Sequence, residues 1–419
     1  MSEFLVVGGG IGGMVAARRL ALSGRSVTLF EAGSSLGGTV AGHTVGGLQL
    51  DAGAESFALR GDTVSTLVAE LGMADDIVSP NPQGAWLYPT TGRAVPLPKL
   101  SLLGIPGSPL AKDVIAVIGM RAAVRAYLET FLPGTYGTDT TSLGELVRKR
   151  MGDVVLDNLV APIVRGVHSI DPHDLDVDRV APGLRTATRR TGSLALGVMA
   201  LREQSRAGSS VAGIRGGMHR VSAALAADLS RLGVDIRLNA PATAVDAAGV
   251  SAGGERFTGR VVVAAPRVID RDSTPGHDAV LATMVLDAPA LDAEPRGTGL
   301  LVATGAPDVQ ARALTHSTAK WHWLRDAAGG RHVLRLSYGA HLDGHHEIAR
   351  RDAETLLGVP LPPASVLDFN VVRWRRPERQ SYTPDGIARV GETASGTGLA
   401  AVVAHAEKEA LSLLRDIQG

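Results

Sequence analysis

The chain has 419 residues, enough for two domains or for one large domain with a long insertion. Its 42 basic residues balance 42 acidic ones, so the basic face of a nucleic-acid-binding protein is not expected. Cysteine is absent, which excludes disulfides, cysteine-ligated zinc, iron–sulfur clusters and thiol catalysis. No apolar run approaches the roughly 18 residues of a membrane-spanning helix, and the apolar start lacks the basic segment of a signal peptide. We therefore expect a soluble protein of the cytoplasm.

The first segment, residues 3–32, has the pattern of a strand, a turn, a helix and a second strand. "EFLVVG" is a continuous apolar run, typical of a buried parallel strand. "MVAARRLALSG" places apolar residues at helical spacing and ends at Gly24. "SVTLFEA" is a second β-rich run. Together these runs predict one βαβ unit.

The rest of the chain alternates between two kinds of pattern. A helix is expected from Asp62, its N-cap, to Gly72, and "AWLYP" after it predicts an aromatic strand. Residues 109–204 are mostly helical in pattern, which indicates a separate lobe within an α/β chain. The α/β pattern returns at 213–265, and strands dominate 278–340. A helix, a strand and a long C-terminal helix complete the chain.

A glycine-rich turn follows the first strand. Gly8, Gly10 and Gly13 satisfy the dinucleotide pattern G-x-G-x-x-G, and Glu31 ends the second strand. Gly8 permits the tight turn, Gly10 lets the backbone approach a pyrophosphate, and Gly13 lets helix and strand pack closely. The helix N-terminus offers its N–H groups and positive dipole end to the phosphates, and Glu31 can accept both hydroxyls of an adenosine ribose. A turn without a ligand is the alternative; the strand before it and the helix after it favour dinucleotide binding.

Two further glycine turns favour FAD over NAD. Gly37 and Gly38 come soon after Glu31, and "DAGAES" places Gly53 shortly before Ser56. A cofactor as long as FAD runs on past the first phosphate turn and needs further close approaches of the backbone. Taken singly, each of these turns is equally well explained as an ordinary loop.

Several longer stretches carry a family resemblance. Glu31, the Gly37–Gly38 pair and "DAGAESF" together resemble the flavin amine-oxidase superfamily of FAD proteins. Four other stretches are similar to the oxygen-dependent protoporphyrinogen and coproporphyrinogen III oxidases: "SLGELVRKRMGDVVLDNLVAPIVRGVHSIDPHDLDV", "GIRGGMHRVSAALAADL", "ALTHSTAKWHW" and "RVGETASGTGLAAVV". The resemblance runs in order along nearly the whole chain.

The resemblance implies an α/β fold with an α+β substrate lobe. A Rossmann-like FAD domain is assembled from three chain segments, and the segments between them form a mixed helical and antiparallel-sheet substrate domain. This division matches the alternation of patterns along the chain. We therefore expect an FAD-binding domain at 1–80, 206–275 and 376–419, a helical substrate-binding part at 81–205 and a substrate-domain sheet at 276–375.

The resemblance also implies individual FAD contacts. They fall in the three N-terminal turns, at one position on the adenine side, and in the glycine-rich C-terminal stretch. That last stretch should bring a second helix N-terminus to the flavin end of the cofactor, where negative charge gathers on reduction. The positions are Gly8, Gly10, Ile11, Gly12, Gly13, Glu31, Ala32, Gly37, Gly38, Thr39, Ala54, Glu55, Ser56, Ala242, Gly391, Glu392, Leu399, Ala400 and Ala401.

Three departures from the family pattern stand out. Thr39 replaces a basic residue that is common after the early Gly-Gly pair. Gln83, Gly84 and Ala85 stand where many members carry an arginine before the aromatic strand, and the segment 266–287 is shorter than usual. The last two departures concern the substrate lobe.

The implied activity is FAD-dependent oxidation of a porphyrinogen to a porphyrin in haem biosynthesis, with O2 as acceptor and H2O2 released. Coproporphyrinogen III is the favoured substrate and protoporphyrinogen IX the next. The cofactor carries the redox chemistry, so neither a catalytic triad nor a metal site is expected. The histidines of "HLDGHHEIAR" are interpreted as a solvated loop. The helix "AKDVIAVIGMRAAVRAYLETFL" is expected to pack against other helices, with weak peripheral membrane contact as the alternative.

Lys320 and Arg93 are the candidate catalytic residues. Lys320 in "THSTAKW" either orders a water near the flavin, as a lysine does in amine oxidases, or solvates a strand end, which is the interpretation we favour. Arg93, Lys99 and Arg165 are candidates for binding substrate carboxylates, and each is equally well explained as a surface charge.

Two other functions stay open. An FAD-dependent amine oxidase or desaturase would share the glycine turns, but aromatic residues are only 4% of the chain, which makes an aromatic cage beside the flavin hard to supply. A catalytically degenerate protein that binds FAD or a tetrapyrrole is the other alternative, and the departures in the substrate lobe motivate it.

Overall fold

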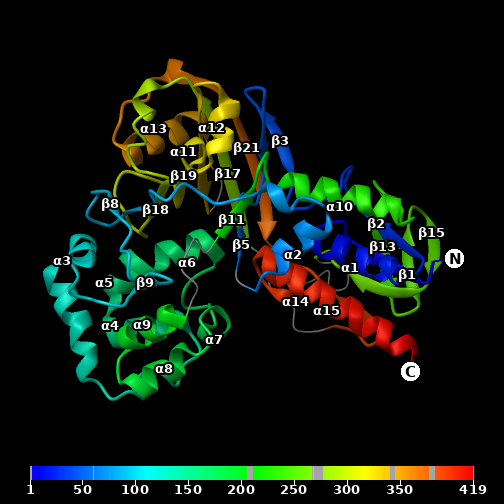
Figure 1. The fold of residues 1–419 in the computed structure, drawn as a ribbon, viewed down its shortest axis with the longest axis horizontal. Coiled ribbons are helices and arrows are strands. Elements are labelled where there is room, and N and C mark those ends of the chain that lie inside the picture. The colour runs from blue at the N-terminus through cyan, green and yellow to red at the C-terminus, as the bar shows by residue number, and fades with distance from the viewer. Residues whose placement is uncertain are drawn as a thin grey trace. The chain divides into compact units, whose positions relative to one another are not determined.

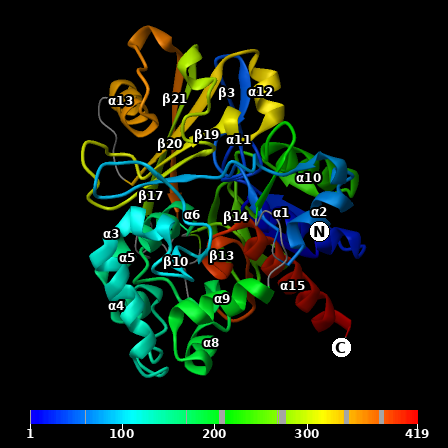
Figure 2. The same cartoon turned by 60° about the vertical axis from the view of Figure 1, so that its left-hand side comes forward.

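The computed structural model describes residues 2–59, 61–168, 170–204, 211–266, 268, 277–339, 345–376 and 383–418. The chain forms two compact units (Figures 1 and 2). Unit 1 comprises Met1–Pro80, Ser209–Asp278 and Val372–Gly419, and unit 2 comprises Asn81–Gly208 and Ala279–Val371. Unit 1 therefore takes three separate stretches of the chain, and unit 2 takes the two between them. The predicted fold class, α/β with an α+β lobe, is confirmed.

Unit 1 is built on a five-stranded parallel sheet in the order β12-β2-β1-β16-β22. Its strands are β12 (Asp235–Arg237), β2 (Val27–Phe30), β1 (Phe4–Val7), β16 (Arg260–Val263) and β22 (Ile387–Arg389). Phe4 of the central strand lies opposite Val27 on one side and Arg260 on the other. β1 and β2 are buried along their whole length, as apolar strands of a parallel sheet are. The predicted βαβ unit is confirmed.

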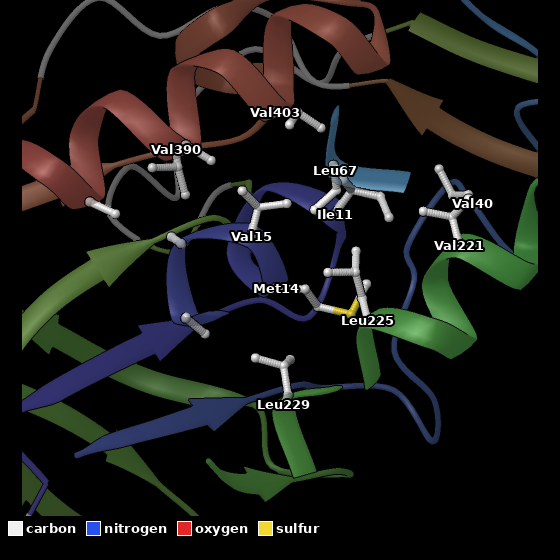
Figure 3. Packing of buried hydrophobic residues seen from close by; sticks show 14 of the residues in the cluster. Ile11, Met14, Val15, Val40, Leu67, Val221, Leu225, Leu229, Val390 and Val403 are labelled. Carbon is white, nitrogen blue, oxygen red and sulfur yellow. The ribbon is translucent and has the colours of Figure 1, made fainter. Parts of the chain in front are cut away.

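Three helices complete the core of unit 1: α1 (Ile11–Leu22), α10 (His219–Arg231) and α15 (Leu399–Gln418). Figure 3 shows α1 between α10, which contributes Leu225, and α15, which contributes Val403. α1 is buried on almost every side, which explains why its sequence is apolar around its circumference. Its one buried charge, Arg18, is paired twice: Nε lies 2.7 Å from the Asp228 carboxylate and Nη1 lies 2.5 Å from that of Glu70.

Small antiparallel sheets surround this core. β13 (Ala242–Asp246), β14 (Gly249–Ala252) and β15 (Glu255–Thr258) form a meander, and β5 (Phe57–Ala58), β11 (Val211–Ile214) and β6 (Ile77–Val78) form a second sheet. β3 (Gly42–Val45) and β4 (Leu48–Asp51) form a hairpin. Its two connecting residues, Gly46 and Gly47, have φ values of 55° and 74°. Two residues with positive φ are what a tight hairpin turn requires, and glycine adopts them without strain.

The helix expected from Asp62 is α2 (Thr63–Glu70). Gly72 follows its C-terminus with a φ of 75°, so the predicted end is confirmed. Asp62 stands at the N-cap position, but its φ of 53° is left-handed and its side chain makes no capping hydrogen bond. The predicted cap interaction is therefore wrong, because the side chain of a cap reaches the first turn from an extended backbone.

Unit 2 is organised around a mixed seven-stranded sheet in the order β21-β17-β20-β19-β18-β7-β8. The strands are β21 (Val366–Arg376), β17 (His277–Leu286), β20 (His332–Tyr338), β19 (Ala313–His316), β18 (Gly299–Val302), β7 (Trp86–Tyr88) and β8 (Val95–Pro96). The aromatic strand "AWLYP" is thus confirmed as β7. One apolar cluster joins the sheet to α13 (His345–Leu357) through Leu314, Leu336, Ala349 and Ala353.

A helical block forms the rest of unit 2, as the pattern of residues 109–204 predicts. Its main helices are α3 (Lys112–Tyr127), α4 (Leu143–Met151), α6 (Ala161–His168), α8 (Leu184–Thr191) and α9 (Leu194–Gln204). The shorter elements are α5 (Asp153–Val155), α7 (Val177–Val180), α11 (Ser317–Lys320), α12 (His322–Ala328), a π-helical segment (Leu156–Val160), β9 (Ser101–Leu102) and β10 (Ile105–Pro106). In unit 1, α14 (Glu392–Ser395) precedes α15.

The long apolar helix expected from residue 111 is interrupted. Gly119 has φ 75° and ψ 162°, so α3 is two helices joined at a kink. Val114, Val117 and Ala126 are buried in the helical block, which confirms the predicted packing of one face. The sequence pattern does not reveal the kink, because apolar residues continue at helical spacing on both sides of it.

A buried ion pair ties this block together. Arg150 of α4 and Glu129 are both fully buried, and Nε of Arg150 lies 2.7 Å from Oε2 of Glu129. The other two guanidinium nitrogens donate to backbone carbonyls of Glu129, Pro133, Tyr136 and Gly192. The Glu129 carboxylate also accepts from the backbone N–H groups of Leu194 and Ala195 at 3.0 Å. Every polar atom of the pair is bonded, as a charge in a low-dielectric interior requires.

Within the described residues, none of the helices has both the length and the apolar character needed to span a bilayer.

Candidate functional site

The glycine-rich turn after β1 contains glycines of two kinds. Gly8 has a φ of 105°, and a Cβ there would lie 2.8 Å from the backbone nitrogen of Ala265. A Cβ on Gly13 would overlap the carbonyl oxygen of Gly8. These two glycines are therefore required by the packing of the chain itself. Gly10 differs, because its φ is −70° and no atom lies within 4 Å of an added Cβ. Gly10 thus faces open space at the N-terminus of α1, as a backbone that admits a phosphate must.

Glu31 lies beside this turn at the end of β2. One carboxylate oxygen accepts a hydrogen bond from the N–H of Gly9 at 2.6 Å, and the other accepts from Gly33 at 2.7 Å. The carboxylate is therefore held in place before any ligand binds. A carboxylate has about four acceptor positions, so two backbone donors leave capacity for two hydroxyls.

The second glycine turn lies directly on the first. The N–H of Gly37 donates to the carbonyl of Gly9 at 2.8 Å, and Gly10 and Gly37 form an isolated parallel bridge. Gly37 and Gly38 have φ values of 121° and 58°. A Cβ on Gly38 would lie 3.2 Å from the Cα of Gly10. A side chain on Gly38 would therefore press against the first turn, whereas one on Gly37 would meet the carbonyl of Val40 and the side chain of Ser222.

The third turn continues the series. The N–H of Ala54 donates to the carbonyl of Thr39 at 3.0 Å, and a Cβ on Gly53 would overlap that carbonyl. The indole N–H of Trp374 donates to the carbonyl of Ala52 at 2.8 Å. Residues 8–13, 37–39 and 52–56 therefore form one continuous surface of glycine-rich backbone, although the sequence separates them.

The C-terminal glycine-rich stretch meets the first turn. A Cβ on Gly12 would lie 2.8 Å from the Cα of Gly391 and 2.9 Å from its nitrogen. Gly391 follows β22 with a φ of 85°, and α15 begins after Gly398. The residues of the first turn of α15, Leu399, Ala400 and Ala401, are partly exposed, and the N–H groups of a first turn have no intrahelical acceptor.

The remaining unit 1 candidates surround this surface. The carbonyl of Glu31 accepts from the N–H of Ala240 at 2.8 Å, which brings the start of β13 and Ala242 near Ala32. Ile11 is buried in the core, so its side chain holds α1 in place. Glu55, Ser56 and Glu392 are partly exposed. The structure thus brings the predicted cofactor residues of three chain segments together within unit 1.

The candidate residues of unit 2 are not assembled in the same way. Lys320 ends α11, and its Nζ lies 4.9 Å from the centre of the Trp321 ring. Arg93 is exposed in the connection between β7 and β8, and Lys99 is also exposed. Arg165 of α6 lies 2.5 Å from the Asp171 carboxylate. No interaction that the described part of the chain shows joins Arg93 to Lys320.

The structure reveals a histidine pair that the sequence does not. Nε2 of His316 lies 3.1 Å from Nδ1 of His332, whose Nε2 lies 3.0 Å from the carboxylate of Asp292. His316 is fully buried, and burial lowers its pKa to about 3, with the charges of His332 and Arg325 acting in the same direction. It is therefore neutral at physiological pH. The two histidines are sixteen positions apart on neighbouring strands, a pairing without a local sequence signal.

Among the residues that the structure describes, no group of three or more His, Asp or Glu side chains is arranged so that it could hold a metal ion. His341 of the predicted solvated loop lies outside the described residues. His345, His346 and Glu347 form the first turn of α13, where Glu347 pairs with Arg350 and Arg351.

The chain was compared with protein families, with characterised proteins and with solved structures. The family described as flavin-containing amine oxidoreductases matches residues 11–286. The coproporphyrinogen III oxidase of Mycobacterium tuberculosis (strain ATCC 25618 / H37Rv) is 28% identical over 454 residues, covering 98% of this chain and 97% of that protein. The enzyme of the same name from Mycobacterium leprae (strain TN) is 29% identical over 453 residues, covering 98% and 95%. A solved structure from Exiguobacterium sp. 255-15, provisionally assigned as a protoporphyrinogen oxidase, superposes with a TM-score of 0.82 at 23% identity, over 99% of both chains. At that identity the structural likeness establishes the fold.

Proposed function

This chain belongs to the family of flavin-containing amine oxidoreductases, and on that premise we propose that it oxidises a porphyrinogen to a porphyrin. It is an FAD-dependent oxidoreductase. Coproporphyrinogen III is the proposed substrate ahead of protoporphyrinogen IX, O2 the proposed electron acceptor and H2O2 the second product.

The observation that carries this proposal is the extent of the similarity. It covers 98% of this chain and 97% of the Mycobacterium tuberculosis coproporphyrinogen III oxidase, so it includes unit 2 as well as unit 1. A likeness confined to unit 1 would indicate a shared flavin site and nothing about the substrate. The balanced charge and the mixed sheet of unit 2 are compatible with a small organic substrate.

Unit 1 supplies the residues proposed to hold FAD. The open side of Gly10 and the first turn of α1 would admit the pyrophosphate, and the free acceptor positions of Glu31 would take the ribose hydroxyls. The three glycine turns would line the path of the cofactor, since they lie against one another beside the open position at Gly10. When bound, FAD supplies the redox chemistry by taking electrons from the substrate carbon.

The N-terminus of α15 is proposed to serve the flavin end of the cofactor. The Gly12–Gly391 contact places this second helix entrance next to the first. Its N–H groups and dipole would stabilise negative charge on the reduced ring. Glu392 would accept hydrogen bonds from hydroxyls of the linking chain. In this arrangement unit 1 binds and orients the cofactor, and no side chain of unit 1 is required to exchange a proton with the substrate.

A coupled assay tests the proposal. The FAD-loaded protein is supplied in air with coproporphyrinogen III or with protoporphyrinogen IX, and porphyrin fluorescence and H2O2 are followed together. We expect both signals to rise faster than in the enzyme-free control, more so with coproporphyrinogen III. Protein that fails to exceed autoxidation with both substrates would refute the proposal. Turnover of a primary amine in the same peroxide assay, without porphyrinogen oxidation, would establish the amine oxidase alternative instead.

A further inference from the structure

Arg312 occupies an irregular position in the sheet of unit 2. Its N–H donates to the carbonyl of Ser337 at 2.8 Å, while the next residue, Ala313, is also the register partner of Ser337. Two residues opposite one is a β-bulge, which changes the direction of a side chain at the end of a strand. On the other side, the N–H of Val302 donates to the carbonyl of Arg312 at 2.9 Å, so the backbone of the bulge is fixed on both sides.

The bulge lays the guanidinium of Arg312 across Gly339. A Cβ at position 339 would overlap Cζ and Nη2 of Arg312. The φ of Gly339 is not positive, so the backbone conformation does not demand a glycine there. The glycine at 339 therefore makes room for the arginine, and the direction of the guanidinium depends on it.

A second arginine lies beside the first. A Cβ on Gly166 of α6 would lie 2.5 Å from a methyl group of Leu301, and Leu301 is the register partner of Ala313. This contact brings Arg165 of α6 next to Arg312 of the bulge. Burial and then the charge of Arg165 hold the pKa of Arg312 below its usual value.

The two arginines differ in their partners. Arg165 is paired with Asp171, whereas the side chain of Arg312 has no acceptor among the described residues. Arg312 is solvent-exposed and Arg165 is half-buried. Two neighbouring guanidinium groups repel each other, and an anion that binds both removes the repulsion. Guanidinium donors match a carboxylate in bidentate geometry. The bulge, Gly339 and Arg165 thus prepare Arg312 for an anionic ligand.

We propose that Arg312, supported by Arg165, binds a carboxylate at the rim of the tetrapyrrole substrate. The inference rests on the proposed function, because that function supplies a ligand with peripheral carboxylates. Arg312 is a binding and specificity-determining residue in this assignment and takes no part in the redox step. A substrate with more rim carboxylates gains more from the pair.

The test uses FAD-loaded protein with Arg312→Gln, which removes the charge, and Arg312→Lys, which keeps it without the planar fork. Gly339→Ala displaces the guanidinium while leaving it in the chain. Arg185→Gln is the matched control, since that arginine of unit 2 is half-buried and is already bonded to the Asp178 carboxylate. Binding of coproporphyrin III is measured by fluorescence beside its tetramethyl ester, which has the same ring without carboxylates.

Loss of a charged hydrogen bond weakens binding by about tenfold or more. We expect this weakening of coproporphyrin III binding in Arg312→Gln and a smaller weakening in Arg312→Lys. Gly339→Ala should also bind coproporphyrin III more weakly. Binding of the ester should not change in any variant, and Arg185→Gln should bind both ligands as the unaltered protein does. With coproporphyrinogen III, KM should rise while kcat stays within about twofold. Equal weakening of acid and ester, or an unchanged Kd and KM in Arg312→Gln, would overturn the arginine site alone. Unaltered protein that oxidises neither porphyrinogen would instead overturn the proposed function.

Discussion

Arg150→Met would remove a buried guanidinium whose three nitrogens all have acceptors. Methionine is close to the size of the arginine stem, so the main effect is electrostatic. Glu129 would keep the N–H donors of Leu194 and Ala195, but its charge would lose the only cation bonded to it within the described residues. Breaking one side of a buried ion pair costs about 3–5 kcal/mol, and we expect this loss in the free energy of unfolding of unit 2.

The measurement is urea denaturation followed by tryptophan fluorescence. Trp86, Trp321 and Trp323 belong to unit 2 and only Trp374 to unit 1, so the signal reports mainly on the unit that carries the mutation. Arg148→Met is the matched control, because Arg148 lies on the same helix and its pair with Glu145 is exposed. Exposed pairs of this kind contribute little to stability because solvent screens them, so Arg148→Met should remain close to the unaltered protein.

The double variant Arg150→Met, Glu129→Leu separates the loss of a charge pair from the loss of packing. Removing both charges leaves no uncompensated carboxylate, so we expect it to recover part of the stability lost in Arg150→Met. The electrostatic reasoning is refuted if Arg150→Met lowers the free energy of unfolding no more than Arg148→Met does. It is also refuted if the double variant is less stable than Arg150→Met by as much as Glu129→Leu alone destabilises the protein.

Three further predictions concern the buried histidine, the glycine turns and the lysine of α11. The pKa of His316 is about 3 in the folded protein and about 6.5 in the unfolded chain. The stability associated with the neutral His316 is therefore fully present above pH 6.5 and is lost as the pH falls toward 3. The free energy of unfolding falls by up to about 1.4 kcal/mol per pH unit in that range. Urea midpoints between pH 7.5 and 5 should therefore fall less in His316→Phe than in the unaltered protein. Gly10→Ala should fold normally but retain little FAD, as measured by flavin absorbance after gel filtration. Equal FAD retention in Gly10→Ala and the unaltered protein would contradict the pyrophosphate assignment. Gly12→Ala should lose FAD and also stability, by about 1–3 kcal/mol, because its Cβ meets backbone atoms of Gly391. Lys320→Met should keep porphyrinogen turnover within about threefold, because the variant retains the Lys320 carbonyl that accepts from the N–H of Asn81 at 2.9 Å, and a proton acceptor need not come from this loop. A loss of a hundredfold or more would give the amine a chemical role.

The sequence predicts the features of this protein that are local or that combine a turn with regular elements. The βαβ unit, the end of α2 at Gly72 and the strand at Trp86 depend on patterns that a few neighbouring residues set. Glu31 is found because it ends a strand at a fixed distance from the glycine turn.

Features that depend on long-range contacts escape such reasoning. The sequence marks both Gly12 and Gly391, yet nothing in it says that they touch. The sequence also does not predict that the guanidinium of Arg312 lies against Gly339, because the two residues meet only across neighbouring strands. Gly119 was inside an unbroken apolar period, so its kink comes from backbone geometry that the pattern does not encode.

The order of the strands in unit 1 has a consequence for synthesis on the ribosome. β1 and β2 emerge first, but the neighbours that complete their sheet, β16 and β22, are made only after residues 260 and 387. Pairing across such long stretches of chain is slow. The nascent N-terminal segment must therefore wait, with one edge of β1 uncovered, until β16 (Arg260–Val263) has been translated. Because α15 supplies the last wall of the glycine-lined surface, FAD is expected to be taken up only after α15 (Leu399–Gln418) has been translated.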